Sequence, residues 1–202
     1  MIADDIRALA GMVRDSADAG ERAAAAWVHA RLLEAGVEDV AREPYRWPRT
    51  YAWSHLAHAL CGLSRRRWVR LAAALSYELE VSGRLQWSQR LVPRGHGVNV
   101  VARLPAAGMV ERTFVLVAHL DAQRSGLVWD RRIVEAGAAR RVAKRSMTPA
   151  AAAGAVAIAL GFRPLVALNV AALADTATRA TVPGANDNAS GVAALLELAR
   201  RL

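Results

Sequence analysis

The sequence predicts an α/β fold, and three observations support this prediction. Apolar side chains recur at the helical interval through Gly20–Ala35, and again from Val192 to the last residue. Between these helices lie Val98–Leu104 and Thr113–Leu120, which have the composition of strands. The second is a continuous apolar run, as is typical of a strand that is covered on both faces. Helices flanking buried strands indicate a mixed core.

Length and composition restrict the class of protein. A length of 202 residues predicts one domain, with room for some added segments, since domains average about 150 residues. The hydrophobic fraction of 54% excludes a disordered chain. Cys61 is the single cysteine, which excludes a disulfide framework and a thiolate-rich zinc site. Any metal chemistry therefore depends on histidine and carboxylate side chains.

The net charge of +9 is compatible with binding to nucleic acid, to anionic lipid or to neither. The arginines gather beside apolar stretches and are not interleaved with aromatic residues in a reading motif. We therefore expect no nucleic-acid partner. Asp4 and Asp5 stand where a signal peptide would be basic, so we expect no signal peptide. This leaves a cytoplasmic or a membrane-associated location open.

The first helix and strand have clear boundaries in the sequence. Asp18 and Glu21 have the spacing of a capping box, in which each side chain satisfies a free amide at the helix start. Gly36 is a natural left-handed stop. The next element, Val37–Glu43, is predicted to be a short strand that ends before Pro44.

Two apolar regions interrupt this α/β pattern, and the first of them consists of two pieces. Tyr51–Leu63 and Trp68–Tyr77 are separated by a turn at Ser64–Arg67, and each is shorter than the roughly 20 residues that span a bilayer. They could form a packed helical hairpin, an interfacial helix pair or remnants of membrane helices. Pro149–Ala174 is also apolar, but Arg163 and the proline after it argue against one transmembrane helix.

One polar cluster follows the buried strand. His119 and Asp121 stand at the carboxyl end of Thr113–Leu120, where open α/β sheets bind their ligands. A carboxylate that holds one ring nitrogen of a histidine makes the other nitrogen a better metal ligand. The alternative is a polar strand end that is simply exposed to water.

A second polar cluster precedes the last helix. Asp187 lies in a glycine-bounded loop before a helix that begins near Ala189, and the helix N-terminus favours its ionised form. An ionised carboxylate at that place can bind a cation. The alternative is that Asp187 or Asn188 merely caps the helix.

Taken together, the two clusters resemble the co-catalytic zinc exopeptidases. The pattern is an apolar strand, His-x-Asp, then GANDNASG and a VAALLEL helix. This family comprises bacterial leucyl aminopeptidases, glutamate-carboxypeptidase relatives and glutaminyl-cyclase-like enzymes. The resemblance covers Ala19–Tyr45, Gly97–Gln123 and Val182–Leu202. It implies a three-layer α/β/α fold and an enzyme that hydrolyses peptides with a free N-terminus by means of two zinc ions.

The resemblance also implies roles for individual residues. His119 matches a histidine ligand of one zinc ion, and Asp121 matches the carboxylate that orients this histidine and supports catalysis. Asp187 matches the aspartate that bridges both ions, and the family often holds the following peptide bond, here Asp187–Asn188, in cis.

The sequence also departs from the family pattern. The family has a Glu-Glu pair that supplies the general base and a ligand, then a further aspartate and a final histidine. Only fifteen residues follow Asp187, and Glu197 among them matches no ligand position. We therefore expect the amino-terminal part of such an enzyme, inactive alone. The expected divisions are peptidase segments 1–48, 96–125 and 181–202, and apolar insertions 49–95 and 126–180.

The main rival interpretation is a non-catalytic protein that acts at a membrane surface or binds a partner through the apolar insertions. His55 and His58 share a helix face without nearby carboxylates, which favours packing or interfacial residues over metal ligands. His29 and His96 are expected at the surface.

Overall fold

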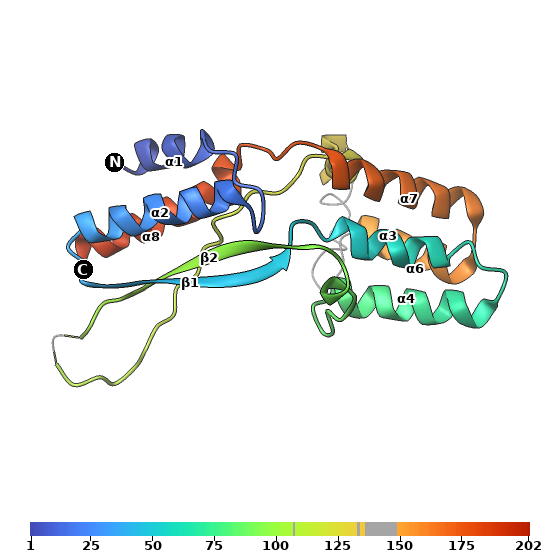
Figure 1. Cartoon of the computed structure of the whole chain (residues 1–202), viewed down its shortest axis with the longest axis horizontal. Helices are drawn as coiled ribbons and strands as arrows, with labels where there is room; N and C mark the ends of the chain where they lie inside the picture. Colours follow the sequence, from blue (N-terminus) through green and yellow to red (C-terminus); the bar gives the residue numbers. More distant parts are fainter. Residues whose placement is uncertain (107, 133, 136–148) are drawn as a thin grey trace. The chain divides into compact units, whose positions relative to one another are not determined.

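The computed structural model describes residues 1–106, 108–132, 134–135 and 149–202 (Figure 1). The chain divides into two compact units. We call the first the site unit; it comprises Met1–Arg49, Arg94–Gln123 and Thr181–Leu202. We call the second the helical unit; it comprises Thr50–Pro93 and Arg124–Ala180.

The site unit combines helices with a two-stranded antiparallel sheet, which is compatible with the predicted α/β class (Figure 1). Strands β1 (Asp39–Pro48) and β2 (Arg94–Arg103) pair in one register along their whole lengths. The helices are α1 (Ile2–Ala10), α2 (Ala19–Glu34) and α8 (Ser190–Arg201). Their apolar faces form one core, which includes Leu9, Val28, Leu32, Val192 and Leu196. The helices predicted at Gly20–Ala35 and from Val192 onward are confirmed as α2 and α8, whereas α1 was not predicted.

The start of α2 differs from the prediction. Asp18 is the N-cap residue but makes no side-chain capping bond, and it pairs instead with Arg49 at 3.1 Å. Glu21 accepts a hydrogen bond from the backbone N–H of Ala17 at 2.6 Å. The predicted capping box is therefore wrong, because the two side chains have partners outside the first turn. Gly36 follows the helix with φ +86°, the left-handed conformation expected of it.

Strand β1 runs past the predicted end at Glu43. Pro44 stands opposite Val98 in the register, and pairing continues to Pro48. A proline lacks an N–H donor, so it is tolerated only where a strand has a free side. Within the described residues β1 pairs with β2 alone, and its other edge provides that free side.

The strand predicted at Thr113–Leu120 is wrong. These residues have no sheet pairing in the structure, and Phe114 and Val117 are 80% and 84% exposed. An apolar run becomes a strand only when a neighbouring strand satisfies its backbone groups. In the described part of the chain, β1 and β2 pair only with each other, so this run is left without a partner.

The helical unit contains α3 (Ala52–Cys61), α4 (Arg67–Val81), α6 (Pro149–Leu160) and α7 (Arg163–Thr178). Two short 3₁₀ helices, Ser88–Arg90 and Leu127–Trp129, complete it. Helices α3 and α4 form the packed hairpin that was one of the three alternatives for this region, with Ala59, Ala73 and Tyr77 in its core. No helix among the residues that the structure describes has the length and apolarity to cross a membrane.

The apolar stretch predicted at Pro149–Ala174 is divided into two helices, whereas the sequence predicted only that its arginine and proline argue against one transmembrane helix. Gly161 ends α6 with φ +66°, and α7 begins at Arg163 with Pro164 in its first turn. Proline is tolerated there because the first amides of a helix have no helical partner.

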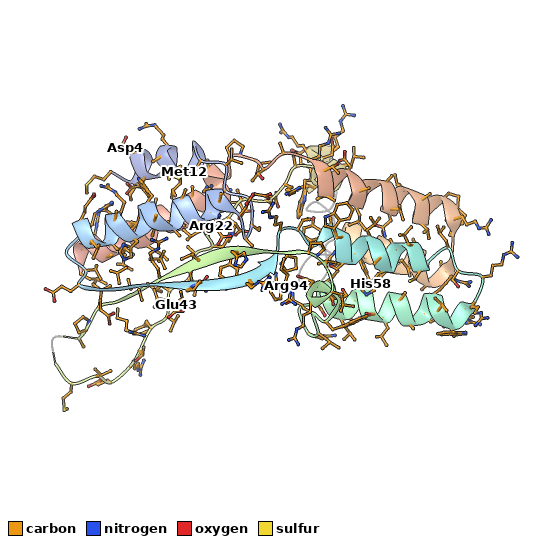
Figure 2. All side chains as sticks on the ribbon, viewed as in Figure 1. Asp4, Met12, Arg22, Glu43, His58 and Arg94 are labelled. Atoms are coloured by element: carbon orange, nitrogen blue, oxygen red, sulfur yellow. The ribbon has the colours of Figure 1, made fainter. Side chains whose placement is uncertain are left out.

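His55 and His58 are buried packing residues of the helical unit. His58, labelled in Figure 2, lies with Nδ1 2.7 Å from the carbonyl of Ser54 and Nε2 2.9 Å from the hydroxyl of Ser76. His55 packs between the rings of Tyr51 and Tyr77, with centroids 5.1 and 5.0 Å away. The packing interpretation of both histidines is confirmed.

Burial of His55 makes the helical unit sensitive to acid. Burial, with a smaller contribution from the adjacent His58, lowers the pKa of His55 from 6.5 to about 4. Because the unfolded state takes up the proton first, the stability contribution is complete above pH 6.5 and is lost as the pH falls toward 4. We expect unfolding at pH 5 to require about 2 kcal/mol less than at pH 8.

Hydrogen exchange of the α3 amides at both pH values measures this difference. The variant His55→Phe should remove most of it, whereas replacement of the exposed His96 by glutamine should not. An unchanged pH dependence in His55→Phe would show that other groups carry it.

Candidate metal site

The structure brings together the three side chains that the sequence predicted to carry chemistry. Nε2 of His119 lies 3.0 Å from Oδ1 of Asp187, although 68 residues separate them in the chain. Nδ1 of the same ring lies 3.2 Å from Oδ1 and 3.0 Å from the backbone carbonyl of Asp121. With the Nδ1 proton donated to Asp121, the Nε2 lone pair faces the Asp187 carboxylate. Two lone-pair donors that face each other in this way are a candidate pair of cation ligands.

The loop that carries Asp187 has an unusual backbone. It begins at Gly184 in the left-handed conformation, with φ +61°. The Asp187–Asn188 peptide bond is cis, which confirms the expectation drawn from the family pattern. The N-cap of α8 is Ala189, with no side-chain capping bond. Asp187 is therefore not a helix cap, and its carboxylate is available to the site.

Gly191, in the first turn of α8, has no side chain and so leaves room for the side chain of Asn188 in this loop. A Cβ atom at this position would lie 2.3 Å from Oδ1 of Asn188, whose side chain lies against it. The hydroxyl of Ser190 donates to the carbonyl of Asn186 at 2.8 Å. The loop is thus tied to the helix that follows it.

Ser16 extends the polar contacts by one residue. Its hydroxyl donates to Oδ2 of Asp121, the oxygen that does not face His119. Both carboxylate oxygens of Asp121 are therefore engaged, one with the imidazole and one with the serine. This fixes the ring plane of His119 and directs Nε2 toward Asp187.

Arg14 joins the two segments that carry the site. Its side chain is 0% exposed and donates to the carbonyls of Leu120 at 2.6 Å, Pro183 at 2.8 Å and Gly184 at 2.9 Å. Its own carbonyl accepts the N–H of Ala122 at 2.7 Å. Burial lowers the pKa of Arg14, and the charge of nearby Asp121 partly opposes this. One guanidinium thus holds the His119 segment beside the Asp187 loop.

Glu21 anchors the loop from which Arg14 and Ser16 project. This buried carboxylate accepts hydrogen bonds from the Ala17 N–H at 2.6 Å, the Tyr45 hydroxyl at 2.8 Å and the Val98 N–H at 3.2 Å. Burial first, then the bond to Glu21, raises the pKa of Tyr45 well above its usual value. The loop is therefore attached to both strands of the sheet.

No pattern in the sequence indicated that Arg14 or Ser16 belongs to the site. The carbonyls that Arg14 binds lie 106 to 170 residues further along the chain, and Asp121 is 105 residues from Ser16. No local pattern distinguishes a buried arginine of this kind from an exposed one. Only the fold identifies them.

The two side chains that face each other at the centre of the site are open to solvent. The side chains of His119 and Asp187 are 52% and 63% exposed. Even when it is charged, an exposed pair of this kind contributes about 0–1 kcal/mol to stability, so this contact does little to hold the fold together. Both side chains are accessible to a ligand from the solvent.

The geometry fits two ligands of one zinc ion. Zinc binds histidine nitrogen at about 2.0–2.1 Å and carboxylate oxygen at about 2.0–2.2 Å, which places two tetrahedral ligands about 3.4 Å apart. The observed separation of 3.0 Å needs only a small outward movement of two exposed side chains. Among the described residues, no group of three or more histidine, cysteine or acidic side chains is arranged to hold one metal ion, since Asp121 lies on the other ring nitrogen of His119.

Comparison with known proteins gave a match to one part of the sequence. The sequence model of Peptidase family M28 matches residues 165–202, which include the Asp187 loop and α8. The match supports a zinc exopeptidase-type family and, by resemblance, a peptidase that hydrolyses its substrate. No curated protein and no solved structure matches the chain.

Proposed function

We propose that the site unit is part of a zinc-dependent aminopeptidase-type site, in which His119 and Asp187 bind metal. The contact of 3.0 Å between Nε2 of His119 and Oδ1 of Asp187 carries this proposal. It joins the two motifs on which the family resemblance rests, and only one of them lies within the matched residues 165–202.

Each neighbouring residue has a distinct part in the proposal. Asp121 holds Nδ1 of His119 and so presents Nε2 as the ligand atom. Ser16 fixes Asp121, and Arg14 keeps the two ligand-bearing segments together. Zinc bound at such a site polarises a scissile carbonyl and lowers the pKa of bound water. The substrates we propose are peptides with a free N-terminus.

A two-zinc site needs more ligands than the described residues bring together. A zinc ion takes about four ligands, and the ligands that we propose among the described residues are His119 and Asp187. We propose that residues other than those described supply the remaining ligands and the general base. The same residues would complete the three-layer α/β/α fold. We therefore expect the chain alone to bind metal weakly and to hydrolyse aminoacyl anilides slowly or not at all.

Metal binding tests the site directly. Isothermal titration of the full chain with Zn²⁺, and the visible spectrum of bound Co²⁺, should both show binding. His119→Ala or Asp187→Asn should weaken it about tenfold or more, because each removes one of two ligands.

The matched controls are His96→Ala and Asp39→Asn, which change the same residue types at exposed places on the two strands. They should bind zinc like the parent chain. Equal affinity in the site variants and the parent would refute the ligand assignments.

A further inference from the structure

The net positive charge of this protein comes from the helical unit. By sequence, the site unit has 12 basic and 13 acidic residues, a net charge of −1. The helical unit has 15 basic and 5 acidic residues, a net charge of +10. The candidate metal site involves none of the charged residues of the helical unit. The excess of positive charge in that unit therefore requires a separate explanation.

Four of these arginines lie at one end of the helical unit. Arg65, Arg66 and Arg67 form the turn between α3 and α4, and Arg163 begins α7 after the turn from α6. All four are exposed, and none makes an ion pair within the described residues.

Contacts of Arg70 show that the two turns are neighbours. This side chain donates to the carbonyl of Ser64 in one turn at 3.0 Å, and to that of Ala159 beside the other at 3.5 Å. A Cβ atom on Gly161 would lie 2.6 Å from its Nε. Figure 1 likewise shows both turns at the same end of the four helices.

The same end exposes large apolar side chains. Trp68 is 65% exposed, Leu160 69% and Phe162 54%, and Leu63 is exposed as well. We call these four residues together with Arg65, Arg66, Arg67 and Arg163 the basic tip. Bulky apolar side chains that lie beside arginines are typical of surfaces that enter the headgroup region of a bilayer, where tryptophan is favoured.

Acidic residues are distant from the basic tip. Glu78 lies eleven residues along α4 from Arg67, and Asp175 lies twelve along α7 from Arg163. These spacings correspond to about 16 and 18 Å, roughly twice the screening length of 8 Å at physiological salt. A second copy of the tip would bring like charges together, so self-association is disfavoured.

We propose that the basic tip docks on the surface of an anionic lipid bilayer, with Trp68 and Phe162 among the headgroups and the arginines on lipid phosphates. The unpaired positive charge and the exposed aromatic rings at one place favour this partner over a second copy or an uncharged surface. The proposal does not depend on the metal site.

Vesicle sedimentation with the full chain tests it at 0.1 M salt. We expect binding to vesicles of phosphatidylglycerol and phosphatidylcholine, and little binding to phosphatidylcholine alone. Arg65→Gln/Arg66→Gln/Arg67→Gln should lower the partition coefficient about 100-fold. Trp68→Ser/Phe162→Ser should lower it about tenfold or more, with circular dichroism confirming that both variants fold.

Controls in the site unit make the same changes elsewhere. Arg42→Gln/Arg46→Gln/Arg112→Gln removes an equal charge, and Leu33→Ser/Trp47→Ser removes comparable exposed apolar groups. Both should bind vesicles like the parent. Equal losses in the controls, strong binding to phosphatidylcholine alone, or salt-sensitive binding to double-stranded DNA without binding to vesicles would each overturn the proposal.

Discussion

Replacing Arg14 by methionine should lower the free energy of unfolding of the site unit by about 3–5 kcal/mol. The variant removes the buried donor to three carbonyls on Leu120, Pro183 and Gly184, and it leaves these partly buried acceptors without that partner. It also removes the buried positive charge that lies near Asp121. Hydrogen exchange of the β2 amides measures the loss in this unit alone.

Two further variants define the cause of the effect. Arg14→Lys keeps the charge but cannot donate to three carbonyls at once, so its loss should be intermediate. Arg42→Met removes an exposed arginine of β1 and should change stability by less than about 0.5 kcal/mol. Parent-like protection of the β2 amides in Arg14→Met would show that the guanidinium does not hold the two segments together.

The variant Glu21→Ala should also destabilise the site unit strongly, by about 3–4 kcal/mol. It leaves three donors without an acceptor, namely the N–H groups of Ala17 and Val98 and the hydroxyl of Tyr45. Each donor that loses its partner lowers the free energy of unfolding by about 1–3 kcal/mol, and water that enters the space offsets part of this loss.

Urea denaturation followed by the same β2 amides measures the change. Glu34→Ala is the matched control, because Glu34 lies on the same helix with its side chain 60% exposed. If Glu21→Ala unfolds at the same urea concentration as Glu34→Ala, the carboxylate is not the anchor of the loop that we describe.

Local sequence patterns predicted the helices of this protein well. The helical interval of apolar residues in 20–35 predicted α2 to within one residue at each end. Arg163 and Pro164 argued against one transmembrane helix in Pro149–Ala174, and the structure has two shorter helices there. These features depend on neighbours a few residues away, which the sequence displays directly.

Features that depend on distant partners were harder to predict. The apolar run 113–120 has the composition of a strand, but no described strand pairs with it. Asp18 and Glu21 have capping-box spacing, yet Arg49, Tyr45 and Val98 compete for their oxygens. In each case a tertiary contact outweighed a local preference.

The candidate site was predictable only in part. The family pattern brought His119, Asp121 and Asp187 together as candidates, and the structure places them in contact, while their roles in metal binding stay predictions. Ser16 and Arg14 were not predicted, because no pattern near them indicates contacts more than 100 residues away.

Arg14 recognises main-chain oxygens only, and this determines which substitutions the site can tolerate. The carbonyls of Leu120 and Pro183 remain in place whatever side chains those residues bear. A saturation library should therefore accept many residue types at these two positions and very few at position 14. Evolutionary drift can thus alter the lining of this junction while its backbone geometry stays constant.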